Sequence, residues 1–234
     1  MRLSPRASAL LWAALLSAGC CSTEAVTSPT PAWSVVYEAD FASQAELEGY
    51  AFSDADRWRW HEGSLELLGQ SDYAPPHRSP TSIALVPELE LRDFDLEVEL
   101  MQTGRAYGHR DLCLFFGFQD PAHYYYVHLA TTPDANAHNV FRVDGAPRTN
   151  VAPVAAEGVD WGQEEWHRVR IERRVETGTV RVFWDDGSTP ILEATDATFG
   201  WGRVGFGSFD DSGRVGSVRI RAPESRAAAA AQPF

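Results

Sequence analysis

Tyrosine and histidine side chains alternate with apolar ones near the middle of the segment from residue 112 to residue 143. Successive side chains of a β-strand point to opposite faces of its sheet. One face of the strand expected at 124–129 therefore carries Tyr124, Tyr126 and His128. The opposite face is apolar or aromatic and is expected in the core: Tyr125, Val127 and Leu129.

The next run divides in the same way, with Phe141 and Val143 as core candidates and His138 and Arg142 on the other face. If the two runs pair through the connection at 131–137, their tyrosine, histidine and arginine side chains share one sheet face. A plain solvated surface carries Lys, Glu, Ser and Thr more often. We therefore predict a ligand-binding face of six residues: Tyr124, Tyr126, His128, His138, Arg142 and Arg148.

This set of side chains is suited to carbohydrate. Aromatic rings offer flat apolar faces to the C–H surface of a sugar, while phenol, imidazole and guanidinium groups orient hydroxyls or a carboxylate. The same set also supports β-elimination of a uronate, with Arg142 or Arg148 neutralising the carboxylate and His128 or Tyr126 acting as base and acid. The catalytic candidates, if the protein is an enzyme, are thus His128, Tyr126 and Arg142. Plain packing of the tyrosines, with no ligand, stays open as an alternative.

Charge and length narrow the classes of function. All 20 cationic side chains are arginine, so Schiff-base and lysine-base chemistry are excluded. The formal net charge of -13 and the pI near 4.9 argue against nucleic acid as a partner, because a nucleic-acid binder needs a basic stripe. A chain of 234 residues, less its ends, is the length of one all-β domain.

The N-terminus is predicted to be a targeting signal rather than part of the folded domain. Arg2 and Arg6 precede an apolar run, Ala7 to Leu16, that is shorter than the roughly 20 residues needed to span a bilayer. The residues that end in Ala18-Gly19-Cys20 resemble a bacterial lipobox, in which cleavage before the cysteine leaves it to be acylated. We predict a signal peptide at 1–19, lipidation of Cys20, and a protein tethered to a membrane of the bacterial cell envelope, facing the periplasm or the exterior.

The rest of the chain divides into a linker, a domain and a tail. Residues 20–32 comprise the anchor cysteine and a tether, since the stretch from Ser22 to Ala32 is small, polar and proline-containing, which is typical of a flexible linker. The segment 223–234 is alanine-rich without apolar periodicity and is predicted to be disordered. Between them, residues 33–222 carry many short strand patterns, including a hairpin turned by Glu176-Thr177-Gly178, and no sustained helical pattern. The fold class is therefore all-β, an antiparallel β-sandwich or jelly roll.

No cofactor is expected from the sequence. Once the two N-terminal cysteines are lipidated or tethered, Cys113 has no partner for an intrachain disulfide. Its apolar neighbours predict a buried, inert thiol. The spacing of His128, Asp134 and His138 matches no strong metal template, so no metal site is assigned. A structural calcium ion stays open, at a site that would use Asp210 and Asp211 with Asp40.

The order of motifs resembles the concanavalin A-like lectin/glucanase superfamily, and most closely its laminin-G-like and 3-keto-disaccharide-hydrolase-like bacterial members. The resemblance spans residues 37–221, and its most recognisable elements are W-H-x-V-R-I at 166–171 and G-x-V-G-F-G at 202–207. It implies a concanavalin A-like sandwich. It is weak for function, because lectins, hydrolases, lyases and adhesion modules share that fold.

The glucanases of this superfamily carry three carboxylates, E-x-D-x-E, on a strand of the concave sheet. The strand of this chain that corresponds to it has Tyr124, Tyr126 and His128 at those alternate positions, so the retaining mechanism, which needs two carboxylates, does not carry over. Asp95, Glu97 and Glu99 do alternate, but in an earlier strand, where we interpret them as its charged outer face.

These observations predict a lipid-anchored, extracytoplasmic domain that captures a carbohydrate or polysaccharide on a concave face of Tyr, His and Arg side chains. A polysaccharide lyase or glycoside hydrolase that uses the same face is the first alternative. A protein-binding adhesion module is the second, because laminin-G-like folds serve that purpose as well.

Overall fold

The computed structural model describes Met1, residues 32–228 and residues 233–234. Residues 2–31 lie outside the described residues. The signal peptide, the lipidation of Cys20 and the tether therefore stay predictions. Within the described part of the chain, no helix is long and apolar enough to cross a membrane.

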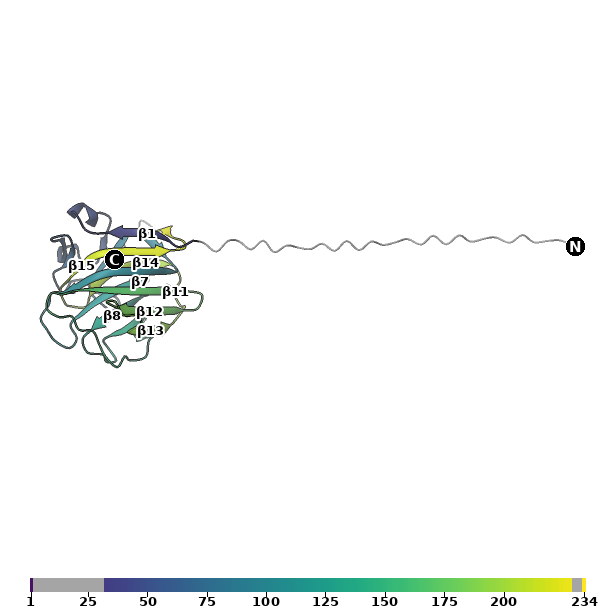
Figure 1. Ribbon diagram of the computed structural model, residues 1–234. Coiled ribbons are helices and arrows are strands. Elements are labelled where there is room, and N and C mark those ends of the chain that lie inside the picture. The colour runs from purple at the N-terminus through teal and green to yellow at the C-terminus, as the bar shows by residue number, and fades with distance from the viewer. Residues whose placement is uncertain (2–31, 229–232) are drawn as a thin grey trace. The chain divides into compact units, whose positions relative to one another are not determined.

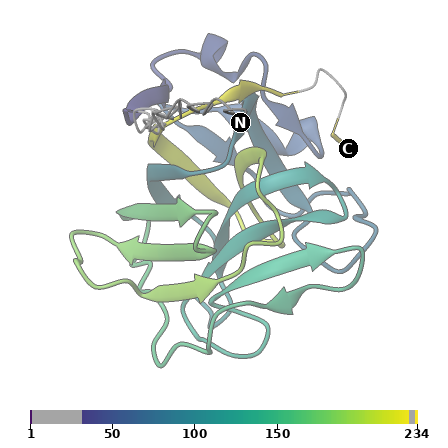
Figure 2. The same ribbon diagram turned by 90° about the vertical axis from the view of Figure 1, so that its right-hand side faces the viewer.

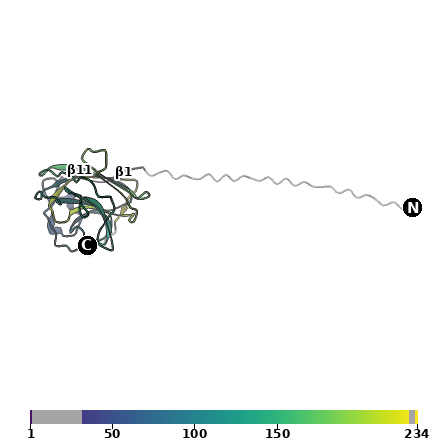
Figure 3. The ribbon, with the colours of Figure 1, turned by 90° about the horizontal axis from the view of Figure 1, so that it is seen from below.

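Two antiparallel sheets form the domain, and they stack face to face (Figures 1 and 2). Sheet A has the spatial order β13 (Leu192–Thr195), β12 (Thr179–Trp184), β11 (Trp166–Arg174), β6 (Phe94–Gln102), β15 (Gly213–Ala222), β4 (Leu65–Leu67) and β3 (Trp58–Trp60), with β1 (Ser34–Ala39) also paired to β15. Seen from below, β1 and β11 of sheet A lie along the upper side of the sandwich (Figure 3).

Sheet B has the spatial order β10 (Thr149–Asn150), β9 (Asn139–Asp144), β8 (His123–Ala130), β7 (Asp111–Asp120), β14 (Gly202–Ser208), β5 (Ser82–Leu91) and β16 (Arg226–Ala227). β2 (Ala51–Phe52) also pairs with β5, and two short 3-10 helices, η1 (Gln44–Leu47) and η2 (Ala55–Arg57), precede β3. The predicted all-β antiparallel sandwich is confirmed, and so is the hairpin between β11 and β12, whose turn residue Gly178 has φ +70°.

The main core lies between the two sheets and follows the period-2 pattern of the sequence. Leu96, Val98 and Leu100 of β6 face Tyr125, Val127 and Leu129 of β8 across it, and all six are buried. The alternate positions of sheet A are charged and exposed or half-buried, which confirms the outer-face interpretation of Asp95, Glu97 and Glu99.

Sheet B differs from sheet A because its outer face is also buried. A second apolar cluster covers that face: Ile83, Leu85, Cys113, Phe115, Phe118, Tyr124, Tyr126, Phe141 and Val143. Phe209 and the C-terminal Phe234 pack onto this cluster, and Phe234 lies 5.6 Å from the ring of Phe118. The buried thiol predicted for Cys113 is confirmed by its place here, at 1% exposure.

The segment 223–234 departs from the predicted disorder where the structure describes it. Arg226 and Ala227 pair with Glu90 and Leu89 of β5. The Arg226 side chain donates to Glu90 over 2.7 Å and lies over the Trp201 ring. Composition alone did not indicate this strand, because its partners are distant in sequence.

Leu129→Ala should lower the free energy of unfolding by about 2–5 kcal/mol, because Leu129 is fully buried between the sheets and the truncation leaves a cavity. Val154→Ala is the matched control, since Val154 is exposed and its truncation should stay within about 0.5 kcal/mol. Equilibrium denaturation in urea measures both. Equal effects of the two variants would contradict the assignment of β8 to the core.

Candidate functional site

The structure divides the six sequence-predicted site residues between the two faces of sheet B. β8 and β9 pair so that Tyr126 lies opposite Phe141, and their rings stack at 5.1 Å. Phe141 and Val143 therefore share the face of Tyr124 and Tyr126, and the predicted assignment of β9 was wrong by one residue. Arg142 instead lies opposite Tyr125 and shares its face, and His138 precedes β9, where its Nδ1 accepts from the backbone N–H of Ala130.

The predicted binding face is covered rather than open. Tyr124 and Tyr126 are 0% exposed in the second apolar cluster. Arg148 closes this region, because its guanidinium lies 4.6 Å from the Phe141 ring and 4.4 Å from the Phe209 ring while it donates to the Tyr126 hydroxyl over 2.7 Å. Burial raises the pKa of the Tyr126 phenol well above its usual value, so this hydroxyl is a poor acid or base. These tyrosines thus pack and do not line a cleft.

Arg142 contributes to a structural network at the end of β8. It donates to Asp196 over 2.6 Å and to the Thr198 hydroxyl over 2.8 Å, and Asp196 also accepts from the Tyr125 hydroxyl. The Tyr125 hydroxyl in turn accepts from the backbone N–H of Phe199. Arg142 therefore fixes the connection between β13 and β14, and it does not meet His128 and Tyr126 as the predicted lyase set requires.

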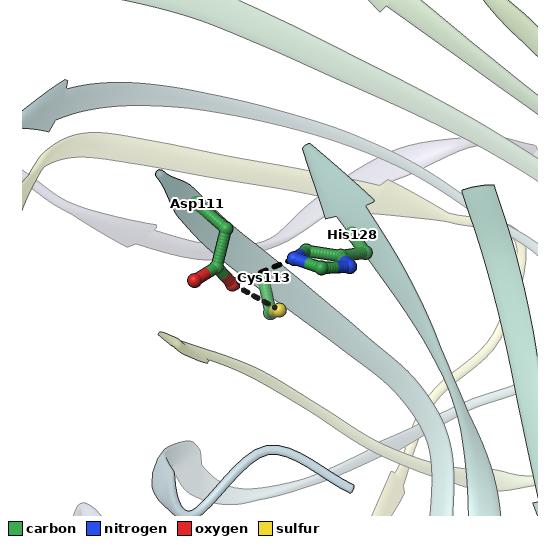
Figure 4. Close-up of side chains that lie close together, drawn as sticks. All are labelled: Asp111, Cys113 and His128. Carbon is green, nitrogen blue, oxygen red and sulfur yellow. Dashed lines mark hydrogen bonds and ion pairs between the residues drawn. The ribbon is translucent and has the colours of Figure 1, made fainter. Parts of the chain in front are cut away.

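His128 belongs to a compact polar cluster with Asp111 and Cys113 (Figure 4). The register of β7 and β8 pairs Cys113 with His128, and Asp111 stands two residues before Cys113 on the same face. Asp111 Oδ2 lies 3.1 Å from His128 Nε2 and accepts from the Cys113 thiol over 3.1 Å. All three side chains are buried, with exposures of 1%, 1% and 4% for Asp111, Cys113 and His128.

The protonation states of this cluster follow from its partners. Burial alone would raise the pKa of Asp111, but the charge of His128 and the hydrogen bonds from Cys113 and Ser208 outweigh it and hold that pKa below its usual value. Burial and the Asp111 charge raise the pKa of the Cys113 thiol well above its usual value. Cys113 is therefore a thiol that donates to a carboxylate, which agrees with the predicted inertness.

Asp211 extends the cluster toward the surface. Its Oδ2 accepts from the Asp111 backbone N–H over 2.9 Å and from the Tyr107 hydroxyl over 2.8 Å. Burial raises the pKa of Asp211 to about 6, and nearby Asp111 adds to that shift. Among the described residues, Asp210 and Asp211 come together with Asp111. The predicted calcium grouping instead used Asp40, which lines a different hollow.

An open hollow of the described domain lies on the outer face of sheet A, and we call it the sheet A groove. It has a volume of about 730 Å³ and crosses β6, β15 and β1. Its charged side chains are five carboxylates and two guanidinium groups: Glu38, Asp40, Glu46, Glu97, Glu99, Arg168 and Arg219. A smaller hollow of about 220 Å³ shares Glu97 and Arg219 with it.

Two contacts between neighbouring strands, Arg219 with Glu38 and Ser217 with Glu99, hold polar side chains of the groove. Glu97 lies opposite Arg170 on one side and Arg219 on the other, and Arg219 also contacts Glu38 at 3.2 Å. Glu99 accepts from the Ser217 hydroxyl over 2.7 Å. Opposite charges that face each other across strands stabilise a sheet modestly and orient the groups for a ligand.

Trp166 is 44% exposed, and its ring lies near Gly216, next to the groove residues Glu99 and Ser217. A Cβ on Gly216 would come within 3.0 Å of the Trp166 ring, so the ring rests on the bare backbone of β15, beside Glu99. An exposed indole next to fixed carboxylates, guanidinium groups and a hydroxyl is the chemistry of a polar ligand with one apolar face. In the sequence this tryptophan stands out only as part of a fold motif, although its position at the start of β11 places it on the charged face.

Comparison with known proteins gives the fold. No family model matches the chain, and no curated protein matches it. Among solved structures, the carbohydrate-binding module CBM66 from Bacillus subtilis is similar with a TM-score of 0.57 and 15% identity over 74% of this chain and 96% of that one.

Two further structures have the same sandwich. The winged bean acidic lectin complexed with methyl-α-D-galactose is similar with a TM-score of 0.56 and 12% identity over 84% of this chain and 100% of the lectin. A putative glycosyl hydrolase from Parabacteroides distasonis is similar with a TM-score of 0.51 and 10% identity over 78% of this chain and 92% of the hydrolase chain. The predicted concanavalin A-like fold is confirmed.

The buried His138, which directly precedes β9, provides a test of this arrangement through pH. Burial, together with the charge of His128, lowers the pKa of His138 from 6.5 to about 4. Because the unfolded ring binds a proton at higher pH than the folded ring, the stability that His138 contributes is complete above pH 6.5 and is lost as the pH falls toward 4. Denaturation curves of His138→Asn should therefore show a shallower loss of stability over this window than the unmodified protein. Asn tolerates the left-handed backbone at this position, where φ is +51°. Identical slopes would contradict the burial of a neutral ring.

Proposed function

We propose that this domain binds a carbohydrate in the sheet A groove. The observation that carries the proposal is the exposed Trp166 beside a hollow whose carboxylate, guanidinium and hydroxyl groups are held by cross-strand pairs. Indole stacks on the C–H face of a sugar, and charged groups make the stronger hydrogen bonds to its hydroxyls. The similarity to a carbohydrate-binding module and to a lectin complexed with a galactoside supports the same class of ligand.

The charge of the groove selects among carbohydrates. Five carboxylates face two guanidinium groups, and the whole chain carries a net charge of -13. A uronate-rich polymer would be repelled over the roughly 8 Å that charges reach at physiological salt. We therefore propose a neutral or amino-sugar glycan as the ligand, in place of the acidic polymer that the elimination chemistry required.

Trp166→Ala should weaken retention on the bound polysaccharide about tenfold or more, because it removes the stacking platform without disturbing the core. Affinity electrophoresis through a panel of neutral, amino-sugar and acidic polysaccharides measures the effect. Trp201→Ala is the matched control, since this half-buried tryptophan contacts Arg226 at the edge of sheet B, away from the groove.

The same panel tests the competing site. Tyr126→Ala should destabilise the fold and leave the affinity of the remaining folded protein unchanged. A folded Tyr126→Ala protein that loses retention while Trp166→Ala keeps it would return the binding face to sheet B and overturn the groove. Retention on no polysaccharide at all would leave the protein-binding adhesion module as the better function.

A glycoside hydrolase is the second candidate, and one observation favours it. Asp95, Glu97 and Glu99 project at alternate positions of β6 along the two hollows of sheet A. Carboxylates in such a row are the groups that glycoside hydrolysis uses. New reducing ends released from a retained polysaccharide, and lost in Glu97→Gln, would establish hydrolysis, whereas retention without products would leave a binding domain.

We further propose that the domain is tethered to a membrane of the bacterial cell envelope through acylated Cys20. The apolar run that ends at Cys20 and the proline-containing segment after it support this proposal. A single acyl chain gives only marginal binding, so stable tethering requires more than one.

Cys20→Ala should move the protein from the membrane fraction to the soluble fraction, or leave it unprocessed in the membrane. Cys21→Ala, one residue away, is the control and should keep the protein anchored. Fractionation followed by mass spectrometry of the N-terminus distinguishes these outcomes. A native protein that is soluble and cleaved at another position would contradict the anchor.

A further inference from the structure

We propose that Asp111, Cys113 and His128 form a buried binding site for a divalent transition-metal ion of the zinc type. The proposal does not depend on carbohydrate binding, because this cluster lies in sheet B and the groove lies on sheet A. Carboxylate, thiolate and imidazole are the three side-chain donors that zinc takes. Hard cations such as calcium take oxygen ligands, so the sulfur and nitrogen donors select against them.

The distances among the donor atoms match a metal ion at their centre. His128 Nε2 and Cys113 Sγ each lie 3.1 Å from Asp111 Oδ2, and the three donor atoms are within 4.8 Å of one another. Zinc bonds of about 2.0 to 2.3 Å at tetrahedral angles separate neighbouring donors by about 3.3 to 3.6 Å. The two distances to Asp111 Oδ2 are therefore within a few tenths of an ångström of the spacing between zinc ligands, and a metal ion bound to all three donors would keep one open position.

The orientation of His128 is that of a metal ligand. Its Nδ1 lies 3.2 Å from the carbonyl oxygen of Asn136, and a carbonyl only accepts, so Nδ1 carries a proton. A ring fixed in this way presents the lone pair of Nε2, as metal-binding histidines do when Nδ1 donates to a backbone carbonyl. Nε2 is buried, has no hydrogen-bond partner and faces the Asp111 carboxylate. Two lone pairs in contact require a shared cation, which is either a proton or a metal.

The charge of the donor groups and the hydrogen bonds to Asp111 favour a metal ion over a proton as the shared cation. The Asp111 carboxylate and a Cys113 thiolate carry two negative charges, which match those of a divalent ion and leave a neutral buried site. Asp211 lies behind Asp111 and adds to the negative potential. The Ser208 hydroxyl donates to Asp111 Oδ1 over 2.8 Å, which orients the carboxylate and leaves Oδ2 toward the other two donors.

Metal binding is coupled to proton release in this arrangement. The Cys113 thiol loses its proton to solvent as the sulfur–metal bond forms, and a proton on His128 Nε2, where present, leaves as well. No electron is transferred. Each proton released makes the apparent affinity about tenfold tighter per pH unit, so binding should strengthen as the pH rises.

Cobalt(II) titration of the full-length protein tests the site, since a cobalt–thiolate bond gives a near-ultraviolet charge-transfer band that proton sharing cannot give. We expect one cobalt ion per chain, displacement by zinc, and affinity that increases with pH. The buried position slows entry, so the titration is repeated on protein refolded in the presence of cobalt. Absence of the band under both conditions would show that the cation shared by His128 and Asp111 is a proton.

Two cysteine variants assign the thiolate. Cys113→Ser should lose the band while Cys20 and Cys21 remain, and Cys20→Ser combined with Cys21→Ser should keep it. The reverse pattern would move the metal to the N-terminal cysteines and overturn the proposal. Zinc should also raise the melting temperature of the unmodified protein and of His123→Gln, a variant of the exposed histidine at the start of β8, but not that of Cys113→Ser. A zinc-dependent shift that survives in Cys113→Ser would equally contradict the site.

Discussion

Burial of sheet B on both faces is the constraint on which the rest of the structure depends. Its inner face packs against sheet A, and its outer face packs under Phe209, Arg148 and the C-terminal Phe234. Polar groups within such a sheet lose contact with water and must find partners inside the protein. Asp111, His128 and Cys113 are therefore bound to one another, and the hydroxyl of Tyr126 is bound to Arg148.

Sheet A is buried on its inner face only, in contrast to sheet B. Only its inner face contributes to the core, so its outer face is free to carry carboxylates and guanidinium groups in cross-strand rows. A cation set made entirely of arginine keeps full charge at any physiological pH and presents fixed planar donors. Under our two proposals, the polar ligand binds to the sheet whose outer face the core leaves free, and the metal site lies in the sheet that is buried on both faces.

The sequence predicted the fold class and the two faces of β8 because the period-2 pattern there is unambiguous. It did not predict which face of β9 goes with them. Both faces of sheet B are apolar, so hydrophobicity cannot distinguish them, and His138 enters the strand through a left-handed backbone that pattern reasoning does not anticipate. Tyr124 and Tyr126 were predicted to line a binding site because the side chains that cover them, among them Phe209 and Phe234, come from segments distant in sequence.

The role of Asp111 was missed through register. Counting back from the turn between Asp120 and His123 pairs Cys113 with Ala130, but an irregularity in β7 near Gly117, where φ is +57°, shifts the register by two and brings His128 opposite Cys113. A shift of two preserves the face of every side chain, which is why the faces were predictable while the partners were not. The exposure of Trp166 could have been predicted from the sequence. It shares a face of β11 with the charged residues at the alternate positions that follow it, and such a face is expected to be exposed.

The short C-terminal strand has a consequence for the behaviour of the protein in solution. β5 lies at the border of sheet B, and β2 and β16 cover different parts of its length. An uncovered strand border presents free N–H and C=O groups that recruit strands from other molecules. Arg226 and Ala227 thus cover one part of this border, at Glu90 and Leu89, against edge-to-edge association with another molecule.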